Sequence, residues 1–107
     1  MQDKWCIIVN AVSRRGVEIA MQFAAKRCNI AFLDMDKESG KRLKKFLEQE
    51  YRVKVFFFHG DIRSDEDRDI FTSVINERYG GADYFMYGKG AWHMMAYPVR
   101  GEWKFVF

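Results

Sequence analysis

The feature that most constrains the fold is a regular alternation of short apolar runs with longer segments of helical periodicity. Four runs are rich in β-branched and aromatic residues, and three of them are apolar almost throughout, which is typical of strands covered on both faces. These runs span residues 5–9, 30–33, 53–58 and 84–87. The pattern predicts a βαβαβαβ order, in which crossovers of this length join parallel strands with right-handed connections.

The three intervening segments have the spacing of amphipathic helices. The apolar stripe of the first comprises Val17, Ala20, Met21 and Ala24, and that of the second, residues 37 to about 50, comprises Leu43, Phe46 and Leu47. The third is predicted to begin after Ser64 as its N-cap and to end at Gly80. The predicted class is therefore α/β: a three-layer, Rossmann-like fold with a parallel sheet of order 3-2-1-4. Two of its three helices lie on one face of the sheet and the third on the other.

Length and composition fit one domain. At 107 residues the chain can bury one modest core, and 49% hydrophobic residues is a globular composition. A formal charge of +3 does not favour nucleic acid or membrane as a partner, and there is no apolar run of 18 residues. We therefore expect a cytoplasmic protein. Cys6 and Cys28 lack CxxC or His-ligand spacing, so we expect them to serve core packing.

The segment of residues 7–20 has the layout of a dinucleotide-binding unit: an apolar strand, a polar loop and a helix. Such a loop normally carries three glycines, but here Asn10 and Arg14 occupy two of the positions and Gly16 alone is kept. Asn tolerates a left-handed turn, and Ser13, Arg14 and Arg15 carry groups that can contact phosphate. Two interpretations stay open. Arg14 is a phosphate ligand, or it is an obstruction in a loop that merely connects strand to helix.

Acidic residues follow the second and third apolar runs. A carboxylate at the position of Asp34 can accept both hydrogen bonds from an adenosine ribose and repels a 2′-phosphate, so NAD is predicted over NADP. The alternative is that Asp34 or Asp36 caps the helix that follows. Asp61 and Ile62 could hold an adenine edge, and the alternative for them is a solvated loop.

Together these residues resemble the short-chain dehydrogenase/reductase family over residues 4–90. The family's TGxxxGxG motif corresponds to VNAVSRRG, and its acidic residue after the second strand corresponds to Asp34. Its Asp followed by an aliphatic residue corresponds to Asp61 and Ile62, and its NNAG becomes YGKG at residues 87–90. The resemblance implies a Rossmann-like, nucleotide-binding-type domain over residues 1–90.

The residues that this family uses for catalysis are not found in the sequence. In the family, a Tyr activated by a Lys four residues later handles the proton during hydride transfer, whereas the 107 residues contain no YxxxK. We expect the chain to end before the family's catalytic segment. His59 and His93 lack zinc-ligand spacing, and the acids among residues 61–69 fit a helix start better than a metal site. No catalytic residue and no metal ligand is predicted.

Three hypotheses about function follow. The first is a truncated protein of the short-chain dehydrogenase/reductase type that acts as an NAD-binding module without independent catalysis. The second is a structural or interaction domain that binds no nucleotide. The third is an NAD-dependent oxidoreductase completed by a partner chain that supplies the Tyr–Lys pair.

Residues 91–107 are predicted to form an aromatic C-terminal tail. Arg100 and Gly101 could turn a short hairpin, and Pro98 favours an edge strand. Because the third helix is alone on its face and the fourth strand is an open edge, apolar surface would stay exposed. We expect the tail to pack on the sheet or at an oligomer interface. A second copy of the chain, or a partner chain, is expected to cover the open sheet face.

Overall fold

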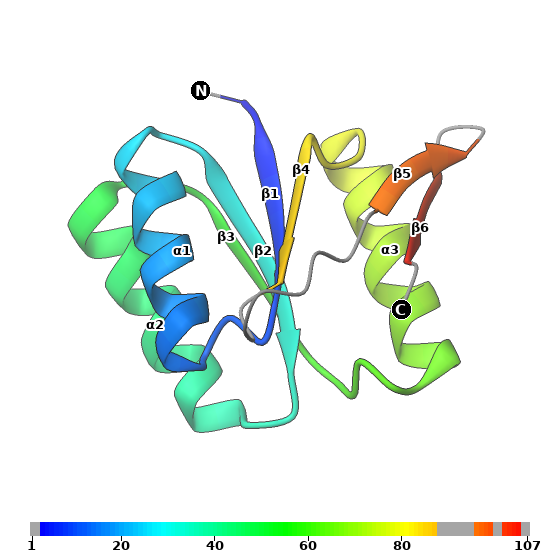
Figure 1. Ribbon diagram of the computed structural model, residues 1–107, viewed down its shortest axis with the longest axis horizontal. Helices are drawn as coiled ribbons and strands as arrows, with labels where there is room; N and C mark the ends of the chain where they lie inside the picture. Colours follow the sequence, from blue (N-terminus) through cyan, green and yellow to red (C-terminus); the bar gives the residue numbers. More distant parts are fainter. Residues whose placement is uncertain (1–2, 88–95, 100–101, 106–107) are drawn as a thin grey trace.

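A computed structural model describes residues 3–87, 96–99 and 102–105, with the backbone alone for residues 87, 96–99 and 102–105. Strands and helices alternate along most of the chain (Figure 1). In order they are β1 (Trp5–Val9), α1 (Arg14–Ala25), β2 (Asn29–Asp34), α2 (Lys37–Tyr51), β3 (Val55–His59), α3 (Asp65–Tyr79), β4 (Tyr84–Tyr87), β5 (Ala96–Val99) and β6 (Glu102–Phe105).

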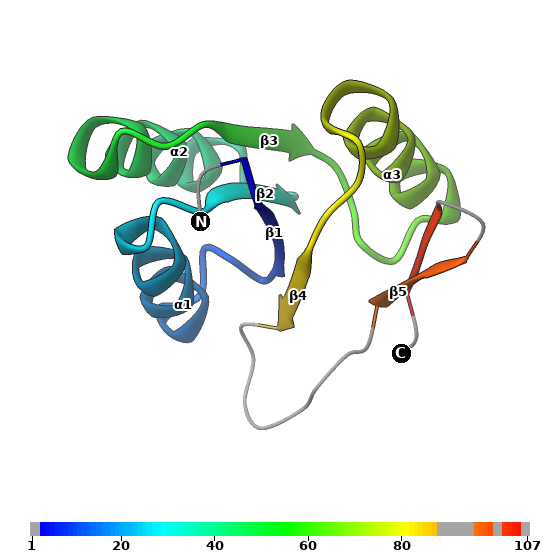
Figure 2. The same cartoon turned by 90° about the horizontal axis from the view of Figure 1, so that it is seen from above.

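The first four strands form one parallel sheet of order β3-β2-β1-β4, as predicted. Ile7 of β1 lies beside Ala31 of β2 on one side and Phe85 of β4 on the other, and Ile30 of β2 lies beside Val55 of β3. Helices α1 and α2 cover one face of this sheet and α3 covers the other (Figures 1 and 2). The predicted three-layer arrangement is confirmed.

The central strands are buried on both faces because their side chains alternate between two apolar cores. Buried members of the core beneath α1 and α2 include Cys6, Ile8, Ala20, Ala24, Ile30, Phe32, Leu43 and Leu47. Buried members of the core beneath α3 are Trp5, Ile7, Ala31, Leu33, Phe71, Ile75 and Ala82. The apolar runs of the sequence are continuous because neighbouring residues serve opposite cores.

Cys6 and Cys28 are fully buried in the core beneath α1 and α2. Burial raises the pKa of both thiols, well above the ordinary value for Cys6 and to about 11 for Cys28. Such thiols stay protonated at neutral pH, and the protonated thiol is not the nucleophilic form. The prediction that both cysteines serve core packing is confirmed.

The third strand begins two residues later than predicted. Arg52 takes a left-handed conformation (φ 57°) after α2, and the N–H of Lys54 donates to Oδ1 of Asn29 at 2.9 Å. The carbonyl oxygen of Lys54 accepts from the N–H of Ile30 at 3.1 Å, the first register pair of β2 and β3 is Ile30 opposite Val55, and β3 starts at Val55. Val53 lies outside the strand, and its apolar side chain is buried in the core beneath α1 and α2.

Side-chain caps mark where each helix begins. Ser13, Asp36 and Ser64 are the N-caps of α1, α2 and α3, and each accepts a hydrogen bond from the backbone N–H three residues later. Gly80 ends α3 in a left-handed conformation with φ 75°. The predicted start and end of the third helix are confirmed. None of the helices in the described ranges is both long and apolar enough to cross a membrane.

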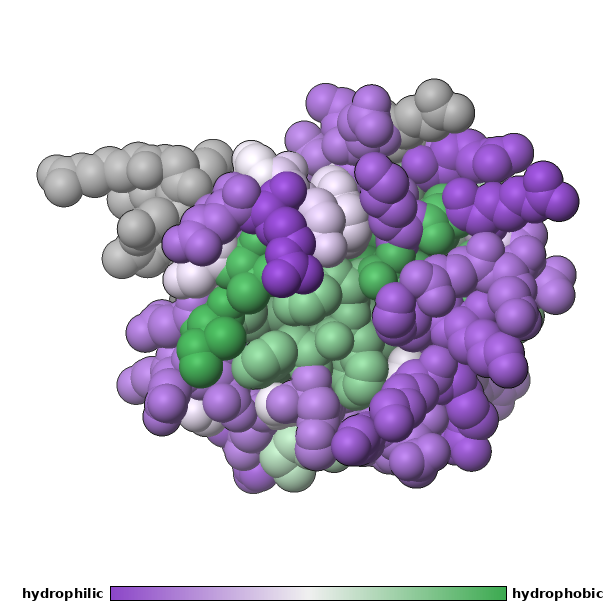
Figure 3. Space-filling view, turned by 180° about the vertical axis from the view of Figure 1, so that it is seen from behind, coloured by the Kyte–Doolittle hydropathy of each residue, from purple (hydrophilic) through white to green (hydrophobic). Residues whose placement is uncertain are grey.

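The two edges of the parallel sheet differ. Seen from behind, the side of the molecule where β3 forms the edge carries an apolar patch (Figure 3), and the phenylalanines Phe56, Phe57 and Phe58 of that strand are only half-buried. Nζ of Lys44 donates to the carbonyl oxygen of Val55 at 3.1 Å, so one acceptor of this edge is satisfied. At the opposite edge, β4 pairs with β1 and with no other strand of the described ranges.

The described part of the tail forms a separate two-stranded sheet. Strands β5 and β6 pair antiparallel, with Ala96 opposite Phe105 and Val99 opposite Glu102, as expected of a hairpin. The expected turn residues 100–101 lie outside the described residues. Strand β6 lies beside α3 (Figures 1 and 2). That residues 91–107 cover the sheet or an oligomer interface stays a prediction.

Candidate functional site

A pocket of about 260 Å³ opens at the carboxyl ends of β1, β2 and β3. It is lined by Asn10, Leu33, Asp34, Met35, Gly60, Asp61, Ile62 and Arg63. In parallel α/β sheets, ligands bind outside the carboxyl ends of the strands, and small-ligand sites begin at about 300 Å³. The pocket suits one part of a dinucleotide, and it contains four of the residues predicted from the sequence, namely Asn10, Asp34, Asp61 and Ile62.

The loop between β1 and α1 is folded tightly on itself. Asn10 adopts the left-handed conformation (φ 57°) for which a glycine would otherwise serve. Its carbonyl oxygen accepts hydrogen bonds from Oγ of Ser13 at 2.6 Å and from the backbone N–H of Ser13 at 3.1 Å. Oγ of Ser13 in turn accepts from the N–H of Gly16 at 3.1 Å. The turn is kept although its first glycine is replaced.

Gly16 lies where α1 approaches this loop most closely. A Cβ atom at position 16 would be 2.0 Å from the carbonyl oxygen of Asn10 and 2.7 Å from Cα of Ala11. Both are backbone atoms, so the neighbouring chain cannot yield by a side-chain rotation. The retained glycine is thus the one that packing of the helix against the loop requires.

Arg14 and Arg15 occupy the first turn of α1. The Arg14 side chain is 97% exposed, and its Nε lies 3.9 Å from the carboxylate of Glu18. The Arg15 side chain is also exposed, and neither residue lines the pocket. Within residues 3–87, the backbone N–H groups of Arg14 and Arg15 have no acceptor. These are two of the donors that a helix N-terminus offers to an anion.

Asp34 ends β2 and stands in the wall of the pocket. Its Oδ1 accepts from the N–H of Asp36 at 2.8 Å. Asp36 is the residue that caps α2, because its Oδ1 accepts from the N–H of Ser39 at 3.0 Å. Hydrogen bonds from Ser39 hold the pKa of Asp36 below its usual range. The cap considered for either residue therefore belongs to Asp36, while Asp34 lines the pocket.

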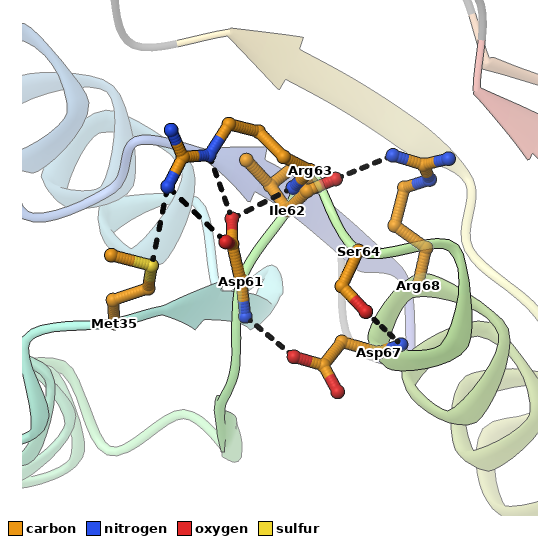
Figure 4. A network of polar contacts seen from close by, with 7 residues as sticks. All are labelled: Met35, Asp61, Ile62, Arg63, Ser64, Asp67 and Arg68. Atoms are coloured by element: carbon orange, nitrogen blue, oxygen red, sulfur yellow. Dashed lines mark hydrogen bonds and ion pairs between the residues drawn. The ribbon is translucent and has the colours of Figure 1, made fainter.

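Asp61 and Arg63 form an ion pair in the loop that follows β3 (Figure 4). Oδ1 of Asp61 accepts from the backbone N–H of Arg63 at 2.9 Å and from its Nε at 3.1 Å. Oδ2 accepts from Nη2 of Arg63 at 3.2 Å. These hydrogen bonds lower the pKa of Asp61 and raise that of Arg63.

The sequence does not predict four of the pocket residues: Leu33, Met35, Gly60 and Arg63. Arg63 matters most because it is charged, and a carboxylate and a guanidinium two residues apart in a short loop were the available signal. His59 does not line the pocket, and its Nε2 lies 3.0 Å from the carbonyl oxygen of Met35. His93 lies outside the described residues. In the described part of the chain, no three His, Cys, Asp or Glu side chains are grouped to hold a metal ion.

Comparison with known proteins identifies the scaffold. The sequence profile of the short chain dehydrogenase family matches residues 4–100, a range that includes the pocket and the β1–α1 loop. The chain belongs to this family. The resemblance inferred from residues 4–90 is confirmed. No curated protein matches the sequence.

Solved structures of dehydrogenases and reductases share the fold of this family member. An NAD⁺-bound xylitol dehydrogenase is 21% identical with a TM-score of 0.74, over 92% of this chain and 37% of that one. L-sorbose reductase from Gluconobacter frateurii, complexed with NADPH and L-sorbose, is 20% identical with a TM-score of 0.76, over 94% and 37%. An alcohol dehydrogenase from the archaeon Thermococcus sibiricus, complexed with 5-hydroxy-NADP, is 27% identical with a TM-score of 0.72, over 77% and 35%.

The chain thus spans 37% of the length of the xylitol dehydrogenase and of the sorbose reductase. In these proteins the shared fold is one part of a longer chain. The similarity to those two structures shows the fold alone.

Proposed function

We propose that this chain binds NAD, with the adenosine half in the pocket and the pyrophosphate at the N-terminus of α1. The observation that carries the proposal is the meeting of Asn10, Asp34 and Asp61 around one pocket at the strand ends. The N–H groups of Arg14 and Arg15, which have no acceptor within residues 3–87, support the pyrophosphate half, because they and the helix dipole favour an anion. Similar structures contain NAD⁺ or NADPH, which supports a nicotinamide cofactor.

Asp34 favours NAD over NADP in this proposal. Its carboxylate stands in the pocket wall, where it can accept hydrogen bonds from ribose hydroxyls and would repel a 2′-phosphate. Arg63 lines the same pocket, but its guanidinium is paired with Asp61 and so offers little charge to a phosphate. The pocket has a net negative charge from these three side chains, which disfavours the more highly charged cofactor.

We further propose that the 107 residues bind the cofactor in the cytoplasm without catalysing hydride transfer by themselves. The cofactor supplies hydride chemistry, but protein groups must still hold the substrate and transfer a proton. The family's pair for that task, YxxxK, does not occur in the sequence. Turnover of an alcohol or ketone by the isolated chain would contradict this part of the proposal.

Calorimetric titration with NAD and NADP tests the binding. Calorimetry reads the binding directly and does not depend on a tryptophan such as Trp5, which is buried at the start of β1, at the opposite end of that strand from the pocket. We expect saturable binding of NAD, weaker binding of NADP, and about a tenfold loss of NAD affinity in Asp34→Asn, which removes the charged hydrogen bonds to the ribose.

Asp36→Asn is the matched control for this substitution. Asp36 lies two residues away and loses the same charge, yet it does not line the pocket, and Asn caps a helix as well as Asp does. We expect its NAD affinity to stay within twofold of the unsubstituted chain. Equal losses in both variants, or no binding at millimolar NAD, would contradict the proposed site.

An interaction domain is the second candidate function, and the open edge of β4 favours it. In the described ranges β4 pairs only with β1, and an unpaired edge of this kind is a surface on which another strand can add. We propose that a second copy, or a partner chain, covers this side of the sheet. A catalytic complex would further require that the partner supply the Tyr–Lys pair. Sedimentation of the chain as a 12.7 kDa monomer would contradict self-association.

A further inference from the structure

We propose that Arg63 is a strap across the adenosine pocket, which competes with the nucleoside for Asp61 and so sets how tightly the pocket binds. The proposal rests on the proposed nucleotide function and adds to it a residue that determines affinity. The strap is defined as the Arg63 side chain together with its contacts to Asp61 and Met35.

The strap joins two loops that are far apart in sequence (Figure 4). Nε and Nη2 of Arg63 engage the two carboxylate oxygens of Asp61 in the β3–α3 loop. The same Nη2 lies 3.9 Å from Sδ of Met35, which follows Asp34 in the β2–α2 loop. Asp34, Met35, Asp61 and Arg63 all line the pocket, so the guanidinium, which contacts Asp61 and Met35, is part of its wall.

The backbone beneath the strap is anchored from α3. The N–H of Asp61 donates to Oδ2 of Asp67 at 2.8 Å, and Nη1 of Arg68 donates to the carbonyl oxygen of Ile62 at 2.6 Å. The N–H of Asp67 is itself bonded to Oγ of Ser64. The backbone at Asp61 and Ile62 is therefore held by α3, whereas the Arg63 side chain is 78% exposed.

Competition follows from the hydrogen bonds that adenine needs. Its amino group requires an acceptor, and the carboxylate of Asp61 in the pocket lining can supply one. Arg63 already donates three hydrogen bonds to that carboxylate, two to Oδ1 and one to Oδ2. The N–H of Ile62 has no acceptor within the described ranges, so the donor for a ring nitrogen is available. An adenine amino group would have to share Oδ2 with the Arg63 guanidinium, so the carboxylate is the stronger acceptor when Arg63 releases it.

The expected effect is modest because the ion pair is exposed. Exposed ion pairs contribute little, and releasing this one should weaken nucleoside binding by about two- to fivefold. Salt screens such a pair, so nucleoside binding should tighten as ionic strength rises. Adenosine is the right probe for this effect, because it carries no charge and its own contacts respond weakly to salt.

The experiment is NMR titration of adenosine into the full chain and into Arg63→Ala, at low and high salt. We expect about two- to fivefold tighter binding in Arg63→Ala, and a salt dependence that the variant lacks. Arg42→Ala is the control, because Arg42 is exposed on α2, contacts Ser39 and does not line the pocket. It should match the unsubstituted chain in both affinity and salt response.

The outcomes separate the strap from the proposed function. Unchanged or weaker adenosine binding in Arg63→Ala overturns the strap and leaves the nucleotide function standing. Weaker binding would assign Arg63 a direct contact with the nucleoside. If neither protein binds adenosine or NAD, the proposed function fails and the strap with it. A ligand-free check is the Asp61 carboxyl signal: its pKa should rise in Arg63→Ala, and no change would overturn the strap.

Discussion

The two halves of the candidate site are built in different ways. The β1–α1 loop is held by the backbone itself, with a left-handed Asn10, two hydrogen bonds to its carbonyl oxygen and a helix packed against it at Gly16. The pocket at the strand ends is lined by partly exposed side chains, and the ion pair of Asp61 with Arg63 is part of its wall. The loop, made of packed backbone, tolerates little change, whereas the partly exposed side chains of the pocket can be changed without unfolding the chain.

The largest loss of stability is expected from Gly16→Ala in the β1–α1 loop. The new methyl group would meet backbone atoms at 2.0 Å, so the helix or the loop must move, and we expect the free energy of unfolding to fall by about 3 kcal/mol or more. Urea unfolding followed by circular dichroism measures the loss.

Gly80→Ala is the matched control for that substitution. Gly80 has a left-handed conformation at the end of α3, but a Cβ there meets nothing within 4 Å. The expected cost is therefore about 1 kcal/mol, from the backbone conformation alone. Similar losses in the two variants would show that close packing is not what retains Gly16.

A smaller effect is expected from removing helix caps on the two sides of the site. Ser13→Ala removes the cap of α1 and the hydrogen bond to Asn10, and Ser64→Ala removes the cap of α3. Each should lower the free energy of unfolding by about 1 kcal/mol, with the larger loss for Ser13 because it makes one more hydrogen bond within its loop. A larger loss for Ser64→Ala in urea unfolding would show that the β1–α1 loop is not the more tightly held half of the site.

The smallest expected effect is the pH dependence of the stability that the Asp61–Arg63 ion pair of the pocket contributes. The pKa of Asp61 is lower in the folded chain than the unfolded value of about 3.9, so its ion pair contributes stability above pH 4. That contribution is lost as the pH falls through the lowered pKa. Urea midpoints of the unsubstituted chain and Arg63→Ala should differ slightly at pH 7 and coincide at pH 2. A difference that persists at pH 2 would contradict this origin.

Most of the fold follows from local pattern. The order of the strands, the faces of the three helices and the caps at Ser64 and Gly80 agree with prediction, because periodicity and right-handed crossovers leave few arrangements open. The start of β3 could not be predicted in this way. It depends on the Asn29 side chain, which binds the N–H of Lys54 from a strand 25 residues earlier.

The candidate site likewise contains residues that the sequence predicts and one whose contacts it does not predict. Asn10 was predicted from its glycine position in the loop after the first strand, and Asp34, Asp61 and Ile62 from their places at the ends of the second and third apolar runs. Parallel strands bring these ends to one edge of the sheet. The spacing of Asp61 and Arg63 was a signal for their ion pair, but the contact of Arg63 with Met35 could not be predicted, because it depends on how close the loop after β3 comes to the loop after β2. Sequence separation does not give that distance.

The sequence by itself determined the family, the α/β scaffold and the edge of the sheet at which a ligand would meet the chain. The tertiary structure alone decided that Asp36 and not Asp34 caps α2, that the Arg14 side chain turns to solvent, and that the Arg63 side chain contacts Met35 in the pocket lining. The physical reason is that a strand or helix is specified by neighbours along the chain. The partner of a charged side chain is specified by which loops the folded sheet brings together.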